Sequence, residues 1–195
     1  MYWYEEEVQS LVLKKETLTV APKTIFYGSS TIRLWVTLTE DFADLAPVNL
    51  GFGGSTLAAC VWFFDRIVGP YTPERIIVYA GDNDLGDGRT PEEVFIFFQQ
   101  LTEKVKQHFS TVPCYFISLK PSPARWTLNT SFEYTNKLIA EEIVENHKNW
   151  KFINIFPDML GPDGEPMAKY YDTDGLHLSP AGYKLWKEIV SQHLA

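Results

Sequence analysis

The sequence predicts an α/β protein in which helices cover both faces of a parallel sheet. Short apolar segments, rich in β-branched and aromatic residues, alternate along the chain with longer amphipathic segments. The apolar segments are nearly continuous in hydrophobicity, as strands that are buried on both faces are. Such an alternation of strands and helices favours a parallel sheet, because each helix carries the chain back to begin the next strand in the same direction.

Five segments of the chain are predicted strands. They lie at residues 24–27, 47–50, 75–80, 113–119 and 151–155. No internal repeat, low-complexity tract or linker interrupts the series. A chain of 195 residues is long enough for one well-packed domain and short for two. We therefore expect one domain over residues 1–195, with residues 1–20 forming a helical extension packed on it.

The segments between the strands are predicted helices. They lie at about residues 31–43, 57–68, 91–109, 131–146 and 180–193, with a further helix at about 5–15. Two of them have clear start signals. Thr90 is a good N-cap residue, and it precedes Pro91 and two glutamates, which suit the first helical turn. Ser179 and Pro180 repeat the arrangement of a hydroxyl residue before proline.

Composition narrows the class of protein. The net charge is −8, which disfavours binding to the phosphate backbone of nucleic acids. The two cysteines, Cys60 and Cys114, lie in apolar segments and lack the spacing of metal ligands. We expect both to be buried, reduced thiols. The sequence predicts no metal site.

The N-terminus does not have the pattern of a secretory signal. It carries three glutamates where a signal peptide is basic, and its longest apolar stretch, residues 11–13, is too short for a membrane span. These features favour a cytoplasmic protein without a membrane span. A leader that had already been removed would leave the same sequence, so the compartment stays open.

Polar loops follow the ends of all the predicted strands. They comprise residues 28–30, 51–54, 81–84, 121–126 and 157–177. Each lies past the carboxyl end of its strand, and this edge of a parallel sheet is where ligands bind. The sequence therefore predicts one functional site formed by several loops.

The parts of an acyl-transfer site are found among these loops. Ser30 follows the first strand, and its hydroxyl needs a base to act as a nucleophile at neutral pH. His177 is the best-placed base, since the other histidines fall near helix C-termini. Asp174 lies three residues earlier and can orient the imidazole. Ser29 and Asp172 are the neighbouring alternatives.

Other loop residues suit binding of an oxyanion or a substrate. Asn83 offers a side-chain amide, and Gly54 offers a backbone N–H that a substrate can approach closely. An Asx turn at Asn83 and an ordinary turn at Gly54 are equally compatible with the sequence. Among the many aromatic residues, Trp126 and Phe52 are the candidates for contact with substrate, Trp126 at the rim of the site.

The sequence also allows two non-catalytic interpretations of the hydroxyl-rich loop after the first strand. The hydroxyls of residues 29–31 can simply cap a helix, or can hold a phosphate of a cofactor at the helix N-terminus, as in a flavodoxin-like flavin- or phosphate-binding module. That module gives Asp174 and His177 no task. Residues 82–88 also share part of the spacing of a calcium loop, but Gly86 and Asp87 stand at the wrong positions for it.

The loop motifs together resemble those of the SGNH hydrolases, the GDSL-type esterase/lipase superfamily, over about residues 24–193. Its ordered blocks match the runs Gly-Ser-Ser at 28–30, Gly-Phe-Gly-Gly at 51–54, Gly-Asp-Asn-Asp at 81–84 and Asp-Gly-Leu-His at 174–177. The first block usually reads Gly-Asp-Ser, so Ser29 replaces an aspartate that is not a member of the triad.

The resemblance implies a fold and a function. The fold is a three-layer α/β/α sandwich with a five-stranded parallel sheet, a flavodoxin-like SGNH hydrolase fold. The function is hydrolysis of a small carboxylic ester, such as a short acyl ester or an acetylated sugar, through an acyl-enzyme without any cofactor. Ser30, His177 and Asp174 form the triad. The backbone N–H groups of Ser30 and Gly54 and the amide of Asn83 form the oxyanion hole.

Overall fold

The computed structural model describes residues 1–194 and has a five-stranded parallel sheet at its centre. The strand order is β2-β1-β3-β4-β5. The strands are β1 (Thr24–Gly28), β2 (Pro47–Gly51), β3 (Arg75–Tyr79), β4 (Cys114–Ile117) and β5 (Trp150–Ile153). The three central strands are almost entirely buried, which explains their continuous apolar character. The prediction of a parallel α/β sheet is confirmed.

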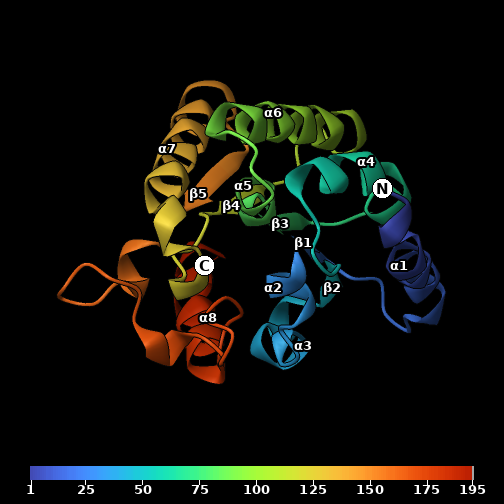
Figure 1. Cartoon of the computed structure of the whole chain (residues 1–195). Helices are drawn as coiled ribbons and strands as arrows, with labels where there is room; N and C mark the ends of the chain where they lie inside the picture. Colours follow the sequence, from blue (N-terminus) through green and yellow to red (C-terminus); the bar gives the residue numbers. More distant parts are fainter. Residues whose placement is uncertain (195) are drawn as a thin grey trace.

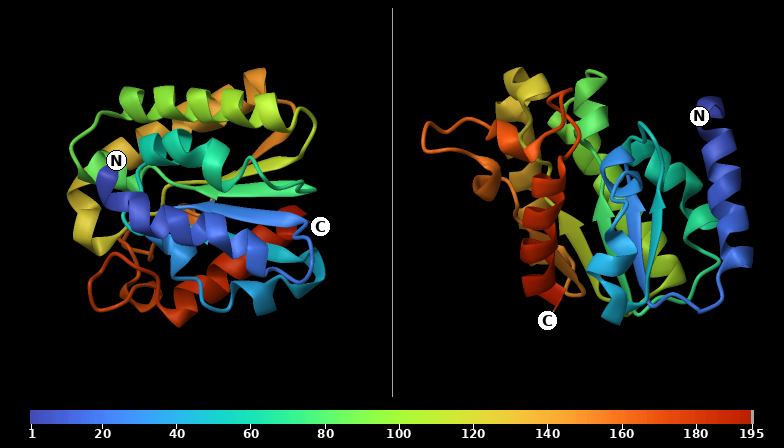
Figure 2. Two further views of the ribbon diagram at one scale, coloured as in Figure 1. Left: turned by 90° about the vertical axis from the view of Figure 1, so that its right-hand side faces the viewer. Right: turned by 90° about the horizontal axis from the view of Figure 1, so that it is seen from below.

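Helices cover both faces of the sheet (Figure 1). On one face lie α4 (Leu57–Ile67), α6 (Pro91–His108) and α7 (Asn129–Asn146). On the other lie α2 (Ser30–Arg33), α3 (Leu38–Asp41) and α8 (Pro180–Leu194). Two views at right angles show the same three layers, with α1 (Glu5–Thr17) beside α4 at the β2 edge (Figure 2).

The helix start signals at Thr90 act as predicted. The Thr90 hydroxyl accepts a hydrogen bond from the backbone N–H of Glu93, and the Glu93 carboxylate accepts one from the N–H of Thr90. This reciprocal pair satisfies backbone donors that the first turn of a helix leaves free.

No helix within residues 1–194 combines the length and the apolarity that crossing a membrane requires.

The predicted helix at 31–43 is wrong as a single element. The chain forms the short helices α2 and α3, with a turn between them. The turn lets the Trp35 side chain enter the core, where it packs against Phe26 and Trp186 and donates a hydrogen bond from Nε1 to the Asp41 carboxylate. Burial of a large aromatic ring outweighs the modest helix propensity of this segment, which is rich in β-branched residues.

Candidate active site

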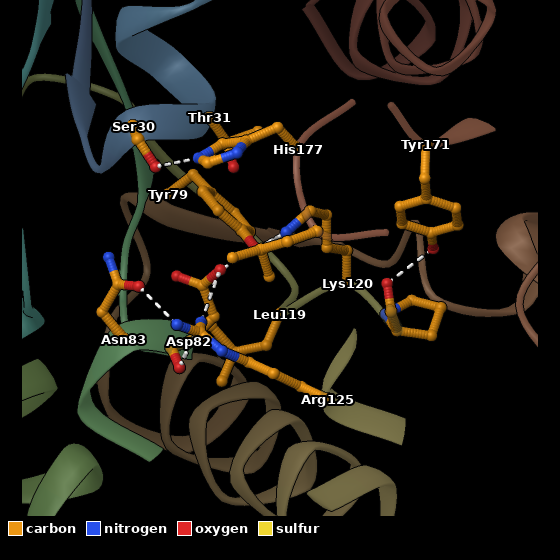
Figure 3. Close-up of polar contacts among 12 residues, drawn as sticks. Ser30, Thr31, Tyr79, Asp82, Asn83, Leu119, Lys120, Arg125, Tyr171 and His177 are labelled. Atoms are coloured by element: carbon orange, nitrogen blue, oxygen red, sulfur yellow. Dashed lines mark hydrogen bonds and ion pairs between the residues drawn. The ribbon is translucent and has the colours of Figure 1, made fainter. Parts of the chain in front are cut away.

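The side chains of Ser30, His177 and Asp174 form a chain of hydrogen bonds at the carboxyl edge of the sheet. Ser30 Oγ lies 3.0 Å from His177 Nε2, and His177 Nδ1 lies 2.5 Å from Asp174 Oδ2 (Ser30 and His177 are labelled in Figure 3). Because a carboxylate accepts at Nδ1, the proton of the neutral ring sits on that nitrogen. Nε2 is then free to accept the Ser30 proton.

A tight turn at residues 172–177, within the long connection between β5 and α8, presents the histidine. Asp172 N–H donates to the His177 carbonyl, and an isolated antiparallel bridge joins Tyr171 to Leu178. Asp174 Oδ1 accepts from the backbone N–H groups of Leu176 and His177, each at 2.9 Å. The carboxylate thus holds both the loop and the imidazole.

The environment of Asp174 keeps its carboxylate ionised. Partial desolvation raises its pKa, but the hydrogen bonds from the His177 ring and from the backbone N–H groups of Leu176 and His177 together outweigh this and lower the pKa to about 2. A carboxylate that stays negative can stabilise an imidazolium beside it. Asp172, the alternative acid, makes no such contact with the ring: among residues 1–194, its Oδ1 accepts only from the N–H of Thr173.

Ser29 is placed differently from Ser30. Ser29 is fully buried, its side chain makes no cap bond to α2, and its Oγ has no hydrogen-bond partner among residues 1–194. The hydroxyl that faces the imidazole therefore belongs to Ser30. The helix-cap interpretation of these hydroxyls has no support in the contacts of Ser29.

Hydrogen bonds tie the loops after β1, β2 and β3 together. Ser55 Oγ donates to the Gly28 carbonyl at 3.0 Å, and Asn83 Nδ2 donates to the Ser55 carbonyl at 3.0 Å. Gly54 has a φ of +62°, a conformation that favours glycine, and a Cβ built there would meet no atom within 4 Å. Gly54 and Asn83 thus come from loops that are joined to the one carrying Ser30.

Asp84 joins the third loop to the start of α4. Its fully buried carboxylate accepts from the backbone N–H groups of Leu57 at 2.6 Å and Ala58 at 3.4 Å, and pairs with Arg89 at 2.9 Å. Burial raises the pKa of Asp84 to about 6, although the hydrogen bond from Leu57 N–H and the charge of Arg89 lower it.

Residues 82–86 form the short helix α5 instead of a calcium loop, and no metal-binding cluster occurs among residues 1–194.

Phe52 does not lie at the surface of the site. Its ring has no exposed area and packs against Tyr4, Tyr27 and Phe63. A ring that is closed off on all sides belongs to the hydrophobic core, so the prediction that Phe52 contacts substrate is corrected. Trp126 is partly buried on the 3₁₀ helix η3 (Pro123–Leu128), which follows β4.

Sequence reasoning missed a buried group of charges beneath Asn83. Lys120 and Asp82 are 1% and 6% exposed, with 3.3 Å between Lys120 Nζ and Asp82 Oδ2. Arg125 also pairs with Asp82 Oδ2, at 3.5 Å (Figure 3). Lys120 gave one signal in the sequence, since it is a charged residue directly after a buried strand.

Comparisons with known proteins show the family of the chain. A profile of the GDSL-like Lipase/Acylhydrolase family matches residues 24–185. The chain belongs to this family. It is accordingly a hydrolase that acts on ester bonds, and a catalytic triad and an oxyanion hole are typical of the family. No match was found among curated proteins.

Several solved structures share the fold. A protein from Streptococcus pneumonia, provisionally described as a platelet activating factor, is 21% identical with a TM-score of 0.86, over 100% of this chain and 95% of that one. A GDSL-like lipase from Bacteroides thetaiotaomicron is 20% identical with a TM-score of 0.76, over 95% and 96%. A mutant acetyl esterase with an acetate ion is 11% identical with a TM-score of 0.70, over 89% and 96%.

Proposed function

We propose that the protein is a serine esterase that hydrolyses small carboxylic esters, either short acyl esters or acetylated sugars, through an acyl-enzyme at Ser30. The proposal is carried by one observation, the contacts of 3.0 Å and 2.5 Å that connect Ser30, His177 and Asp174. This order of groups activates a hydroxyl and stabilises the positive charge that develops on the imidazole. The non-catalytic flavin- or phosphate-binding alternative gives these contacts no role and has no support in the family match.

The first half of the reaction forms the acyl-enzyme. Ser30 Oγ attacks the carbonyl carbon of the ester while its proton moves to His177 Nε2. The tetrahedral intermediate then collapses: the bond from carbon to the alcohol oxygen breaks, and Nε2 returns the proton to that oxygen. Asp174 stays ionised and holds the imidazolium throughout.

The second half of the reaction releases the acid. A water molecule attacks the acyl carbon while His177 Nε2 takes its proton. When the second tetrahedral intermediate collapses, the bond to Ser30 Oγ breaks and Nε2 returns the proton to the serine. Both intermediates carry a negative oxygen, for which the backbone N–H groups of Ser30 and Gly54 and the side-chain amide of Asn83 are the proposed donors.

Exposure of the site supports a small, soluble substrate. The side chains of His177 and Asp174 are 30% and 47% exposed, so the triad is open to solvent. Such an opening admits a polar alcohol, including a sugar, as readily as an apolar one. The likeness to the fold of an acetyl esterase is compatible with a short acyl group. Trp126, on a segment that packs against the His177 loop, is the proposed rim contact.

Labelling with a fluorophosphonate tests the proposed nucleophile. The Ser30 oxygen should displace fluoride and form one stable adduct per chain, which peptide mapping by mass spectrometry locates. His177→Ala should slow labelling strongly because the base is lost. Lys184→Ala, a change on α8 outside the triad, serves as the matched control and should label at the normal rate. An adduct at another residue would contradict the proposal.

A panel of esters tests the proposed substrate class. We expect kcat/KM to be highest for acetyl and propionyl aryl esters and for acetylated sugars, and to decrease with longer acyl chains. Initial rates over acyl chains of increasing length give this profile directly. A maximum at long acyl chains would contradict the short-chain proposal and leave the esterase chemistry intact.

A further inference from the structure

The guanidinium of Arg125 contacts the third loop at two points. Its Nη1 donates to the Asp82 carbonyl at 2.9 Å, and its Nη2 donates to Asn83 Oδ1 at 3.0 Å. The planar, positively charged guanidinium thus donates hydrogen bonds through two of its nitrogens to two successive residues of the loop. The Arg125 side chain is 20% exposed, so water screens these contacts only in part.

The bond to Oδ1, together with one at Nδ2, decides which way the Asn83 amide faces. The two ends of an amide are similar in shape, but one donates and the other accepts. Because Arg125 is a donor only, it selects the orientation in which Oδ1 points to it, and Nδ2 then lies on the side of Ser30 (Figure 3). One hydrogen of Nδ2 goes to the Ser55 carbonyl. The second hydrogen has no partner among residues 1–194 and is left for a ligand.

Gly86 provides the space that the guanidinium occupies. A Cβ at this position would lie 2.8 Å from Arg125 Cζ and 2.9 Å from both Nε and Nη2. Gly86 is the last residue of α5 and does not have a positive φ. Its lack of a side chain therefore serves the close approach of Arg125 and not an unusual backbone conformation.

The segment that carries Arg125 is fixed on its other side to the triad loop. The N–H of Ala124 donates to the Gly175 carbonyl at 3.1 Å. Asp82, which pairs with both Arg125 and the buried Lys120, anchors the guanidinium from below. The contacts of η3 thus reach both Asn83 and the loop between Asp174 and His177.

We infer that Arg125 is a positioning residue: it orients the Asn83 amide so that Nδ2 faces the reacting carbonyl, and Gly86 makes room for it to do so. This inference rests on the proposed function, in which Asn83 is an oxyanion donor. The charged partner at Oδ1 also polarises the amide and strengthens its N–H groups as donors. Arg125 itself acts through Asn83.

A double-mutant cycle on hydrolysis of an aryl acetate tests this. Asn83→Ala should lower kcat by about 10²–10³, the usual effect of losing one oxyanion donor. Arg125→Ala should lower kcat by about 10-fold or more, but by no more than Asn83→Ala does, and should change KM little. In the Asn83→Ala background, Arg125→Ala should lower kcat by less than about 2-fold, because the amide that Arg125 orients is no longer present. Arg125→Lys should restore only part of the rate, since a single ammonium lacks the fork.

A second variant keeps the arginine and moves it. Gly86→Ala should displace the guanidinium and lower kcat about as much as Arg125→Ala does, while alanine favours the helix and preserves folding. In the Arg125→Ala background it should have no further effect on kcat. Arg66→Ala, which removes an arginine from a surface ion pair with Glu5, is the matched control and should leave kcat unchanged. Thermal unfolding of each variant separates loss of rate from loss of fold.

The outcomes separate the two proposals. If Asn83→Ala retains full kcat, the oxyanion role of Asn83 is wrong, and the inference fails with it. If Asn83→Ala loses activity while Arg125→Ala or Gly86→Ala does not, the inference alone is overturned. Equal losses from Arg125→Ala with and without Asn83 would also overturn it, since Arg125 would then act on the substrate or on the fold.

Discussion

Replacing Ser30 by alanine should lower kcat for an aryl acetate by about 10⁶-fold, which is the usual loss when the nucleophile of a catalytic triad is removed. The physical reason is that His177 Nε2, at 3.0 Å from Ser30 Oγ, is left with no hydroxyl to activate. Any residual hydrolysis would come from binding and oxyanion stabilisation alone. Steady-state assays with circular dichroism spectra of both proteins check the loss of rate and the integrity of the fold.

Ser29→Ala is the matched control for Ser30→Ala. It removes a neighbouring hydroxyl that is fully buried and has no partner among residues 1–194. Loss of a buried hydroxyl without a hydrogen bond costs little stability, so both kcat and the unfolding midpoint should stay near those of the wild type. If Ser29→Ala removed activity and Ser30→Ala did not, the nucleophile would be assigned to the wrong serine.

Asp174→Asn should lower kcat by about 10⁴-fold. Asparagine preserves the shape of the side chain but supplies no negative charge, so it neither selects the Nδ1-protonated ring nor stabilises the imidazolium. The matched control is Asp172→Asn, because within the described residues 1–194 the Asp172 side chain accepts only from the N–H of Thr173 and should tolerate the change within about 2-fold. Equal losses in both variants would argue that the loop, and not the carboxylate, is responsible.

The pH profile of the wild type tests the same assignment. The Asp174 pKa is lowered to about 2, so its carboxylate is ionised in the folded protein at every pH above about 4. Its contribution to stability is present above the pKa of an unfolded aspartate and is lost only as the pH falls towards 2. Protonation of Asp174 should therefore cause no loss of kcat/KM above about pH 4, which a pH–rate profile checks. A loss of rate traced to protonation of Asp174 in that range would contradict its assignment.

Much of the site could be predicted from the chain because its parts are local. The Asp174 and His177 contact lies within one four-residue turn, and each loop motif directly follows a strand whose apolar character is visible in the sequence. The rule that ligands bind at the carboxyl edge of parallel strands then brings the loops together. The fold class and the family membership were predictable for this reason and are confirmed.

Residues whose surroundings are set by distant parts of the chain were predicted less well. Phe52 lies in a loop motif of the site, but its ring packs in a core formed by Tyr4, Tyr27 and Phe63. The break between α2 and α3 depends on the space that Trp35 finds beside Phe26 and Trp186. Periodicity along a single segment carries no information about such partners.

The sequence by itself determined the parallel α/β architecture and the family, and it located the loop motifs that hold the candidate triad, since strand hydrophobicity and short motifs are properties of contiguous residues. Only the tertiary structure decided between Ser29 and Ser30, removed Phe52 from the site, and placed Arg125 against Asn83 and Gly86. The physical reason is that hydrogen bonding and burial depend on the positions of side chains from several loops. Those positions exist only after the strands have assembled into the sheet.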